Sequence, residues 1–115
     1  MSVTATIEQN DGCTVVVFTG RITLGSSLSL VDSQVRSLIS NGARKVLFDL
    51  SEVESVDSAG LGMLIYAYGS LASKGGTLRL CGVAPRVQSL LELTKMHTLL
   101  SIDATREESL AALKA

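Results

Sequence analysis

A serine hydroxyl at the start of a predicted helix is the group in this chain best placed to do chemistry. The run Val56–Gly62 follows a predicted buried strand, Val46–Leu50, and precedes apolar residues at helical spacing. We therefore expect Ser58 to be the N-cap of that helix. Gly60 and Gly62 leave the other amides of the first turn uncovered, and these amides together with the helix dipole favour a phosphate. Ser58 is thus a candidate for a cap in one state and a phosphate carrier in another.

The helix after this serine is predicted to extend to about Lys74. Its core face is predicted from apolar residues at positions i, i+3, i+4, i+7 and i+11, which are Leu61, Leu64, Ile65, Tyr68 and Ala72. Met63 and Tyr66 fall outside that stripe and are candidates for contact with a partner.

Catalytic and metal-binding patterns are not expected in this chain. The single histidine, His97, has no evident nucleophile beside it, and neither a G-x-S-x-G turn nor a phosphate-binding G-x-x-x-x-G-K-[ST] loop is present. A local acidic cluster lacks histidine or thiolate support and the spacing of a calcium loop, so we expect a solvated loop edge; its members are Asp49, Glu52, Glu54 and Asp57. The sequence therefore predicts no enzyme, no metal and no cofactor.

Asp57 is an alternative phosphate acceptor, because receiver domains phosphorylate an aspartate that follows a parallel strand. Receivers also use an acidic pair near the first strand to hold a divalent metal, and the segment Thr19–Thr23 has no acidic residue. The sequence favours Ser58 and keeps a receiver-like Asp57 as the alternative.

Composition predicts one globular domain over residues 1–115. Hydrophobic residues make up 46% of the chain and charged residues 18%, which suits a folded core. A net charge of −1, 3% aromatic residues and the absence of tryptophan argue against nucleic acid as a partner.

Direct membrane insertion is not expected. The longest uncharged stretch, Ser58–Ser73, has 16 residues, whereas a membrane span needs about 20. The segment Met1–Gly12 lacks the basic and apolar regions of a secretion signal. Cys13 and Cys81 lie in separate strand-like runs and suggest neither a metal pair nor a disulfide framework. These observations predict a cytoplasmic protein.

The order of predicted elements indicates the α/β class. Ala5–Gln9 and Cys13–Thr19, joined by the turn residues Asn10–Gly12, predict an opening hairpin that Gly20 closes. Helices and strands then alternate: a helix from Ser26 or Ser27 to Asn41, the strand Val46–Leu50, the helix from Ser58, a strand over Thr77–Gly82, a helix begun by Pro85, an edge strand within Leu99–Asp103, and a last helix with a capping box at Thr105–Glu108. This predicts a mixed four- to five-stranded sheet opened by a β-hairpin, with about four helices that cover its faces unequally.

The segment around Ser58 resembles the signature of STAS domains, the anti-sigma-factor antagonist family. The resemblance lies in Asp49-Leu50-Ser51-x-Val53-x-x-Val56-Asp57-Ser58-Ala59-Gly60-Leu61-Gly62 and continues through Lys74–Leu80 and Val87–Thr94. It covers nearly the whole chain and implies a single STAS domain over residues 1–115.

The resemblance implies a role as a regulatory binding protein without catalysis of its own. In that family the serine after the motif's aspartate is phosphorylated by a partner that is both a serine kinase and an anti-sigma factor, which implies Ser58 as the acceptor. The unmodified protein binds the anti-sigma factor, the phosphorylated form is released, and a serine phosphatase resets the switch. Around the acceptor we expect partner contacts from Asp57, Ser58, Ala59, Gly60, Gly62 and Met63.

The chain departs from the family pattern after its second strand. Antagonists carry Gly-Glu-Leu-Asp or Gly-Glu-Ile-Asp there, whereas this chain has Gly20-Arg21-Ile22-Thr23. Arg21 and Thr23 are therefore expected to face a partner, and the charge of this surface differs from that of other antagonists. An alternative role within the family is a STAS subunit that docks on a lipid-exporting ABC permease, which neighbouring genes would distinguish from a signalling protein.

Overall fold

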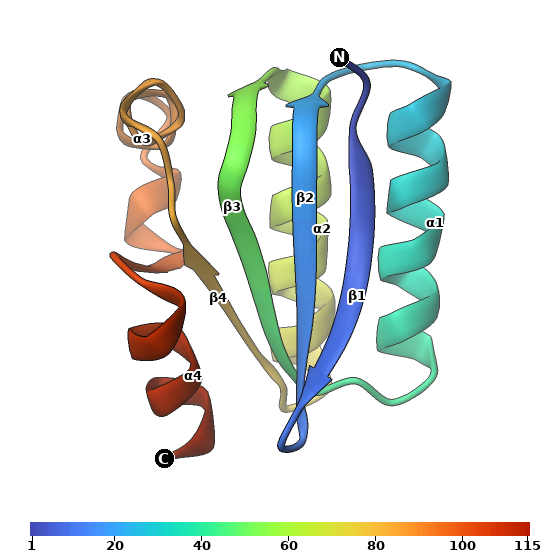
Figure 1. Ribbon diagram of the computed structural model, residues 1–115, viewed down its shortest axis with the longest axis vertical. Helices are drawn as coiled ribbons and strands as arrows, with labels where there is room; N and C mark the ends of the chain where they lie inside the picture. The colour runs from blue at the N-terminus through green and yellow to red at the C-terminus, as the bar shows by residue number, and fades with distance from the viewer.

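A five-stranded mixed sheet organises the chain, and the computed structural model describes residues 1–115 (Figure 1). The strand order is β1-β2-β3-β4-β5, with β1 antiparallel to β2 and the other neighbours parallel. The strands are β1 (Thr4–Asn10), β2 (Cys13–Ile22), β3 (Lys45–Val56), β4 (Thr77–Cys81) and β5 (Ser101–Asp103). The helices are α1 (Ser26–Ser40), α2 (Ser58–Ser73), α3 (Pro85–Leu93), the 3-10 turn η1 (Met96–Thr98) and α4 (Arg106–Lys114). The predicted fold class is confirmed.

The opening hairpin is confirmed, but β2 and β3 are longer than predicted. The two-residue turn has positive φ at Asp11 and Gly12, as a tight hairpin requires. Gly20 was expected to end β2, yet the strand continues to Ile22. A side chain at Gly20 would contact the backbone of Ser2, and the pairing with β3 shifts register between Val17 and Thr19 and again between Gly20 and Arg21. The glycine therefore accommodates an irregularity within the strand rather than its end.

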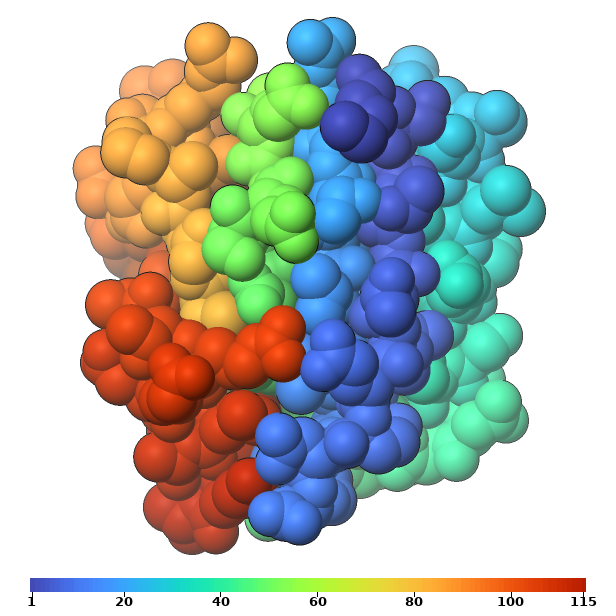
Figure 2. All heavy atoms as spheres, viewed as in Figure 1, coloured from blue at the N-terminus to red at the C-terminus, as the bar shows by residue number.

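The helices cover the two sheet faces unequally, as predicted. The larger core lies between the sheet and α1, α2 and α3, and includes the Phe18 and Phe48 rings packed edge to face with centroids 4.9 Å apart. The smaller core lies under α4. Figure 2 shows that face, with α4 over its lower part and side chains of β1, β2 and β3 open above it.

The core face of α2 differs from the predicted stripe. Its buried residues are Gly60, Met63, Leu64, Ala67 and Leu71. The prediction that Met63 lies off the core face was wrong, because it is only 4% exposed and packs in the larger core. Ala72, predicted inward, is exposed, and Tyr66 is 40% exposed. Apolar residues surround this helix, so their spacing alone does not select one face.

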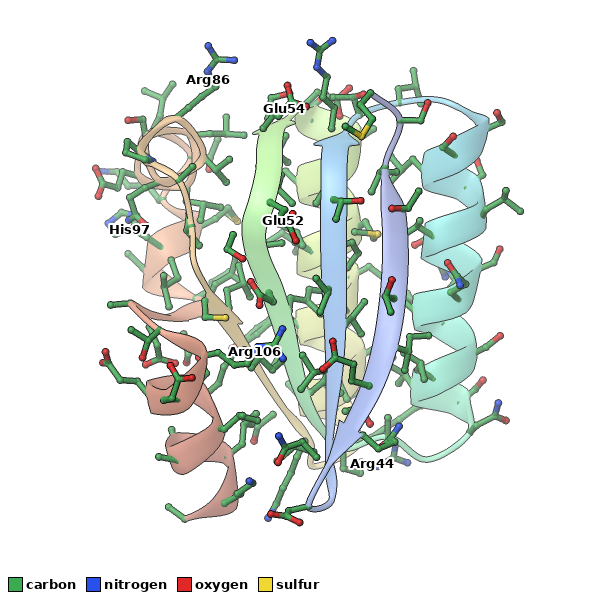
Figure 3. The ribbon with its side chains drawn as sticks, viewed as in Figure 1. Arg44, Glu52, Glu54, Arg86, His97 and Arg106 are labelled. Carbon is green, nitrogen blue, oxygen red and sulfur yellow. The ribbon has the colours of Figure 1, made fainter.

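The predicted solvated acidic cluster is not a loop, because Asp49, Glu52 and Glu54 all lie within β3. Asp49 is only 7% exposed and is paired with Arg106 of α4, whose Nη2 lies 2.8 Å from Oδ2 (Figure 3). Its other oxygen accepts hydrogen bonds from the Ser51 amide and hydroxyl. These hydrogen bonds and the guanidinium hold the pKa of Asp49 below its usual value, although burial opposes them.

A second ion pair supports α4 from β5. Asp103 accepts from Arg79 Nε at 2.7 Å and from the buried Ser109 hydroxyl at 2.6 Å. Under α4, Cys13 and Cys81 are buried free thiols, and burial raises the pKa of Cys81 to about 12. The helix is thus fixed by two charged contacts over a small apolar patch.

Candidate functional site

The corner between β3 and α2 places Ser58 at the surface. Ser58 is the first residue of α2 and is exposed. The expected N-cap was wrong by one residue: Asp57 has extended backbone angles, and its Oδ1 accepts the Gly60 N–H at 2.9 Å. Because the carboxylate caps the helix, the Ser58 hydroxyl is not needed for that purpose. It makes no hydrogen bond within the chain and faces solvent.

Asp57 also joins the start of α2 to the loop before α1. Its Oδ2 accepts the Leu24 N–H at 2.9 Å, and its own N–H donates to the Ile22 carbonyl at 3.3 Å. Hydrogen bonds from the Leu24 and Gly60 amides hold the pKa of Asp57 below its usual value. An acyl phosphate on Asp57 would remove an acceptor from one of these amides, so the geometry argues against the receiver-like alternative.

The two glycines beside Ser58 have different roles. A Cβ on Gly60 would lie 2.0 Å from the Ile22 carbonyl oxygen, so this buried glycine allows α2 to approach β2. The expected partner contact at Gly60 was therefore wrong, because this residue is buried against β2. Gly62 is exposed, and a Cβ there would meet nothing within 4 Å. Gly62 and the half-buried Ala59 lie where a partner over Ser58 can reach them.

The end of β2 brings Arg21 and Thr23 to the same corner. Arg21 pairs with Ser55 across the parallel ladder, and Ile22 pairs with Val56. The Arg21 guanidinium is exposed and lies 3.7 Å from Glu54, a contact that solvent screens strongly. Thr23 is half-buried. The structure therefore brings both of these predicted positions to the corner that holds Ser58.

A groove between α1 and α2 begins beside this corner and has a volume of about 280 Å³. It is lined by Leu24, Gly25, Leu28, Ser29, Asp32, Arg36, Ala59, Gly62, Met63 and Tyr66. The Arg36 guanidinium lies 3.7 Å from the centre of the Tyr66 ring, and its Nε donates to Asp32 Oδ2 at 2.8 Å. Sequence reasoning missed Arg36, because its pairing with Tyr66 across two helices leaves no local signal. It also missed Leu24, which is 81% exposed.

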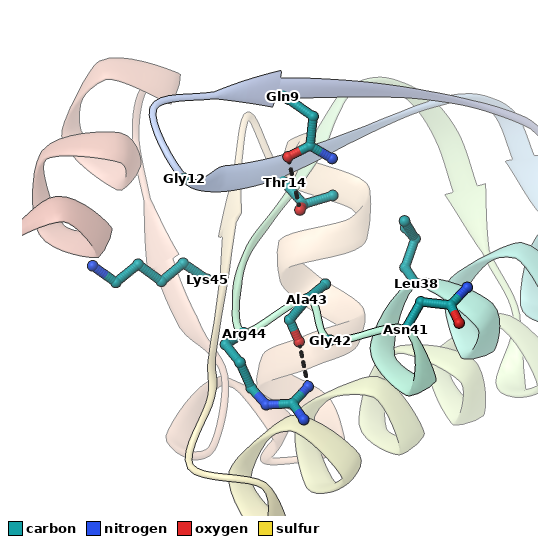
Figure 4. Close-up of a pocket in the computed structure, with 9 residues that line it drawn as sticks. All are labelled: Gln9, Gly12, Thr14, Leu38, Asn41, Gly42, Ala43, Arg44 and Lys45. Carbon is teal, nitrogen blue, oxygen red and sulfur yellow. Dashed lines mark hydrogen bonds between the residues drawn. The ribbon is translucent and has the colours of Figure 1, made fainter.

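A larger cavity of about 560 Å³ lies at the opposite end of β3 (Figure 4). Two of its polar side chains make hydrogen bonds there: Thr14 donates to Gln9 at 3.3 Å, and Arg44 donates to the Ala43 carbonyl at 2.8 Å. Lys45 extends away from the other lining residues. The cavity presents no converging set of free polar groups.

His97 lies apart from the corner, in η1, as an exposed residue whose Nδ1 is 3.3 Å from the Leu91 carbonyl. His97 is therefore a surface residue. None of the helices combines the length and the apolar character needed to cross a bilayer.

The STAS domain profile matches residues 4–109. The chain belongs to the STAS domain family. It is 25% identical over 109 residues to BtrV of Bordetella bronchiseptica, named as a candidate anti-sigma factor antagonist, covering 95% of this chain and 93% of that protein.

Solved structures show the same fold. A crystal structure of a candidate anti-sigma factor antagonist from Thermotoga maritima superposes with a TM-score of 0.91 at 23% identity, over 96% of this STAS chain and 95% of that chain. The anti-sigma factor antagonist SpoIIAA of Bacillus superposes with a TM-score of 0.76 in both its unphosphorylated and its phosphorylated form, at 16% and 15% identity. These two matches cover 97% and 96% of this chain and 99% of each SpoIIAA chain.

Proposed function

We propose that this STAS protein is an anti-sigma factor antagonist switched by phosphorylation of Ser58. In this proposal residues 1–115 act as one binding domain without catalytic activity. The unmodified protein binds an anti-sigma factor that is also its serine kinase, the phosphorylated protein is released, and a serine phosphatase restores binding. The names of the similar proteins support the antagonist role.

The observation that carries the proposal is the exposed Ser58 hydroxyl on a helix start that Asp57 already caps. A phosphate there adds about −1.5 to −2 charges to a chain of net charge −1. The nearby amides of α2 favour that charge, and the Asp57 cap needs no rearrangement to admit it. Modification therefore changes the surface and leaves the backbone in place.

The energy that such a switch needs is small. A penalty of about 1.4 kcal/mol weakens binding tenfold, and a doubly charged group within a docking surface must be either desolvated or paired by the partner. No refolding is required for release. Arg21 and Thr23 give this corner a different charge from that of antagonists with two acids, so we expect the kinase to be specific to this chain.

Mass measurement of the protein from its native cells tests for phosphoserine at Ser58. Pull-downs with the wild type, Ser58→Ala and Ser58→Asp then test the switch. We expect the alanine variant to capture the kinase and the aspartate variant to lose it. Ser33→Asp adds the same charge at an exposed position of α1 and should bind normally. Equal capture by the wild type and both Ser58 variants would contradict the proposal.

A further inference from the structure

The groove between α1 and α2 is continuous with the surface around Ser58. Ala59 and Gly62 line the groove, and both lie within about one helical turn of Ser58. A protein seated over Ser58 therefore covers the mouth of the groove. Its volume of about 280 Å³ lies just below the range of roughly 300–1,000 Å³ usual for small-molecule pockets. Its size suits a protruding side chain better than a cofactor.

The near end of the groove is apolar and rigid. Leu28 and Met63, buried in the larger core, form its floor. Leu24 is 81% exposed at the rim, yet its amide is held by the Asp57 carboxylate. Because the backbone is already fixed, only the side-chain rotamers of Leu24 remain to be ordered when a partner covers it. The open space above Gly62 gives access to the floor.

The far wall is flat and carries no net charge. The Arg36 guanidinium stacks on the Tyr66 ring, and the Asp32 carboxylate beside it balances its charge. A charged group entering the groove would lose water without gaining a free counterion. An uncharged side chain meets apolar carbon below and the stacked pair beside it. The charge balance of the groove therefore selects a neutral aliphatic group.

We propose that this groove is the second half of the docking surface and accepts an aliphatic side chain from the same partner that recognises Ser58. This inference rests on the proposed function. The groove supplies affinity once the partner docks, and the phosphorylation state of Ser58 at its edge decides whether the partner can approach.

Two glycines of α2 provide a matched test. Gly62 and Gly69 are both exposed and lie seven residues apart on one side of the helix, and a Cβ added at either would meet nothing within 4 Å. Only Gly62 lines the groove. Gly62→Leu fills the groove, whereas Gly69→Leu adds the same side chain two turns away. The probe is the purified serine kinase that phosphorylates Ser58, and its dissociation constant is measured by calorimetry.

We expect Gly62→Leu to weaken kinase binding at least tenfold, because burial of one aliphatic side chain contributes about this much affinity. Gly69→Leu should bind within about twofold of wild type. In the wild-type complex the Met63 methyl resonance should shift, which reports directly on groove occupancy.

The outcomes separate the two proposals. Normal binding by Gly62→Leu, with binding lost in Ser58→Asp, would overturn the groove and leave the switch intact. Equal loss in both leucine variants would also overturn it, because the contact would not be specific to the groove. The absence of any kinase whose binding depends on Ser58 would overturn both.

Discussion

The contact between Gly60 and Ile22 gives the sharpest prediction about the corner that holds Ser58. Gly60→Ala would place a Cβ 2.0 Å from the Ile22 carbonyl oxygen and 2.8 Å from its Cγ2. A backbone carbonyl cannot rotate away as a flexible side chain can, so α2 and β2 must separate. Gly62→Ala is the matched control, because it adds the same methyl group to the same helix in open space.

The expected energies follow from these surroundings. Alanine in a helix is favoured over glycine by about 1 kcal/mol, so Gly62→Ala should raise the free energy of unfolding by about 0.5–1 kcal/mol. At Gly60 the same gain is opposed by overpacking of about 1–3 kcal/mol and by about 1 kcal/mol for the strained hydrogen bond from Asp57 to Ile22. Gly60→Ala should therefore destabilise by about 1–3 kcal/mol, and the two variants should differ by about 2–4 kcal/mol.

Urea unfolding followed by circular dichroism measures both free energies. At about 4 °C per kcal/mol, thermal midpoints should differ by about 8–16 °C. Gly60→Ala as stable as wild type would refute the reasoning, because it would mean that α2 does not approach Ile22 as closely as the structure shows. A Gly62→Ala variant less stable than wild type would also refute the reasoning, because its methyl group should meet no other atoms.

Three further predictions concern Asp57 and α4. Asp57 has a lowered pKa in the folded protein, so its stabilisation is present above about pH 4 and is lost as the pH falls through that lower value. Asp57→Asn keeps one acceptor oxygen and loses the other, so it should cost about 1 kcal/mol at pH 7 and flatten the acid limb of a pH–unfolding curve. Parallel curves would contradict this. Arg106→Leu leaves Asp49 without its cation and should lower the free energy of unfolding, measured by urea titration, by about 2–3 kcal/mol. Glu8→Gln removes only the exposed partner of Arg106 and should cost less than about 1 kcal/mol. Equal costs for the two variants would be inconsistent with a buried pair. Cys81, with its pKa raised to about 12 by burial, should react slowly with a disulfide reagent at pH 8, as followed by mass spectrometry. Wild-type labelling at the rate of a free thiol would contradict the burial.

Local signals in the sequence were enough to predict most elements. The Asp11-Gly12 turn, Pro85 at the start of α3 and the Thr105 capping box each act within a few residues, and the structure has all three. The Thr105 hydroxyl accepts the Glu108 N–H as the capping box requires. Such features depend little on tertiary contacts and are therefore readable from the chain alone.

Features that depend on distant contacts were not predictable. Asp57 and Ser58 are both good N-cap residues, and the distant Leu24 amide, bound by Asp57, is a contact that no local pattern shows. The same holds for Gly60. The close approach of the Ile22 carbonyl explains the glycine there, and no local pattern shows that contact. The exposed serine was found from the sequence, but the groups that hold it in position were not.

Of the two hydrogen bonds of the Asp57 carboxylate, one is local, to Gly60, and the other reaches Leu24, which lies 33 positions away in the chain. The corner that presents Ser58 therefore exists only when the loop before α1 and the start of α2 have come together. An enzyme that recognises this corner reads a folded epitope rather than a linear motif. A synthetic peptide spanning the β3–α2 junction should accordingly be a poor substrate, and a newly made chain should escape modification until it has folded.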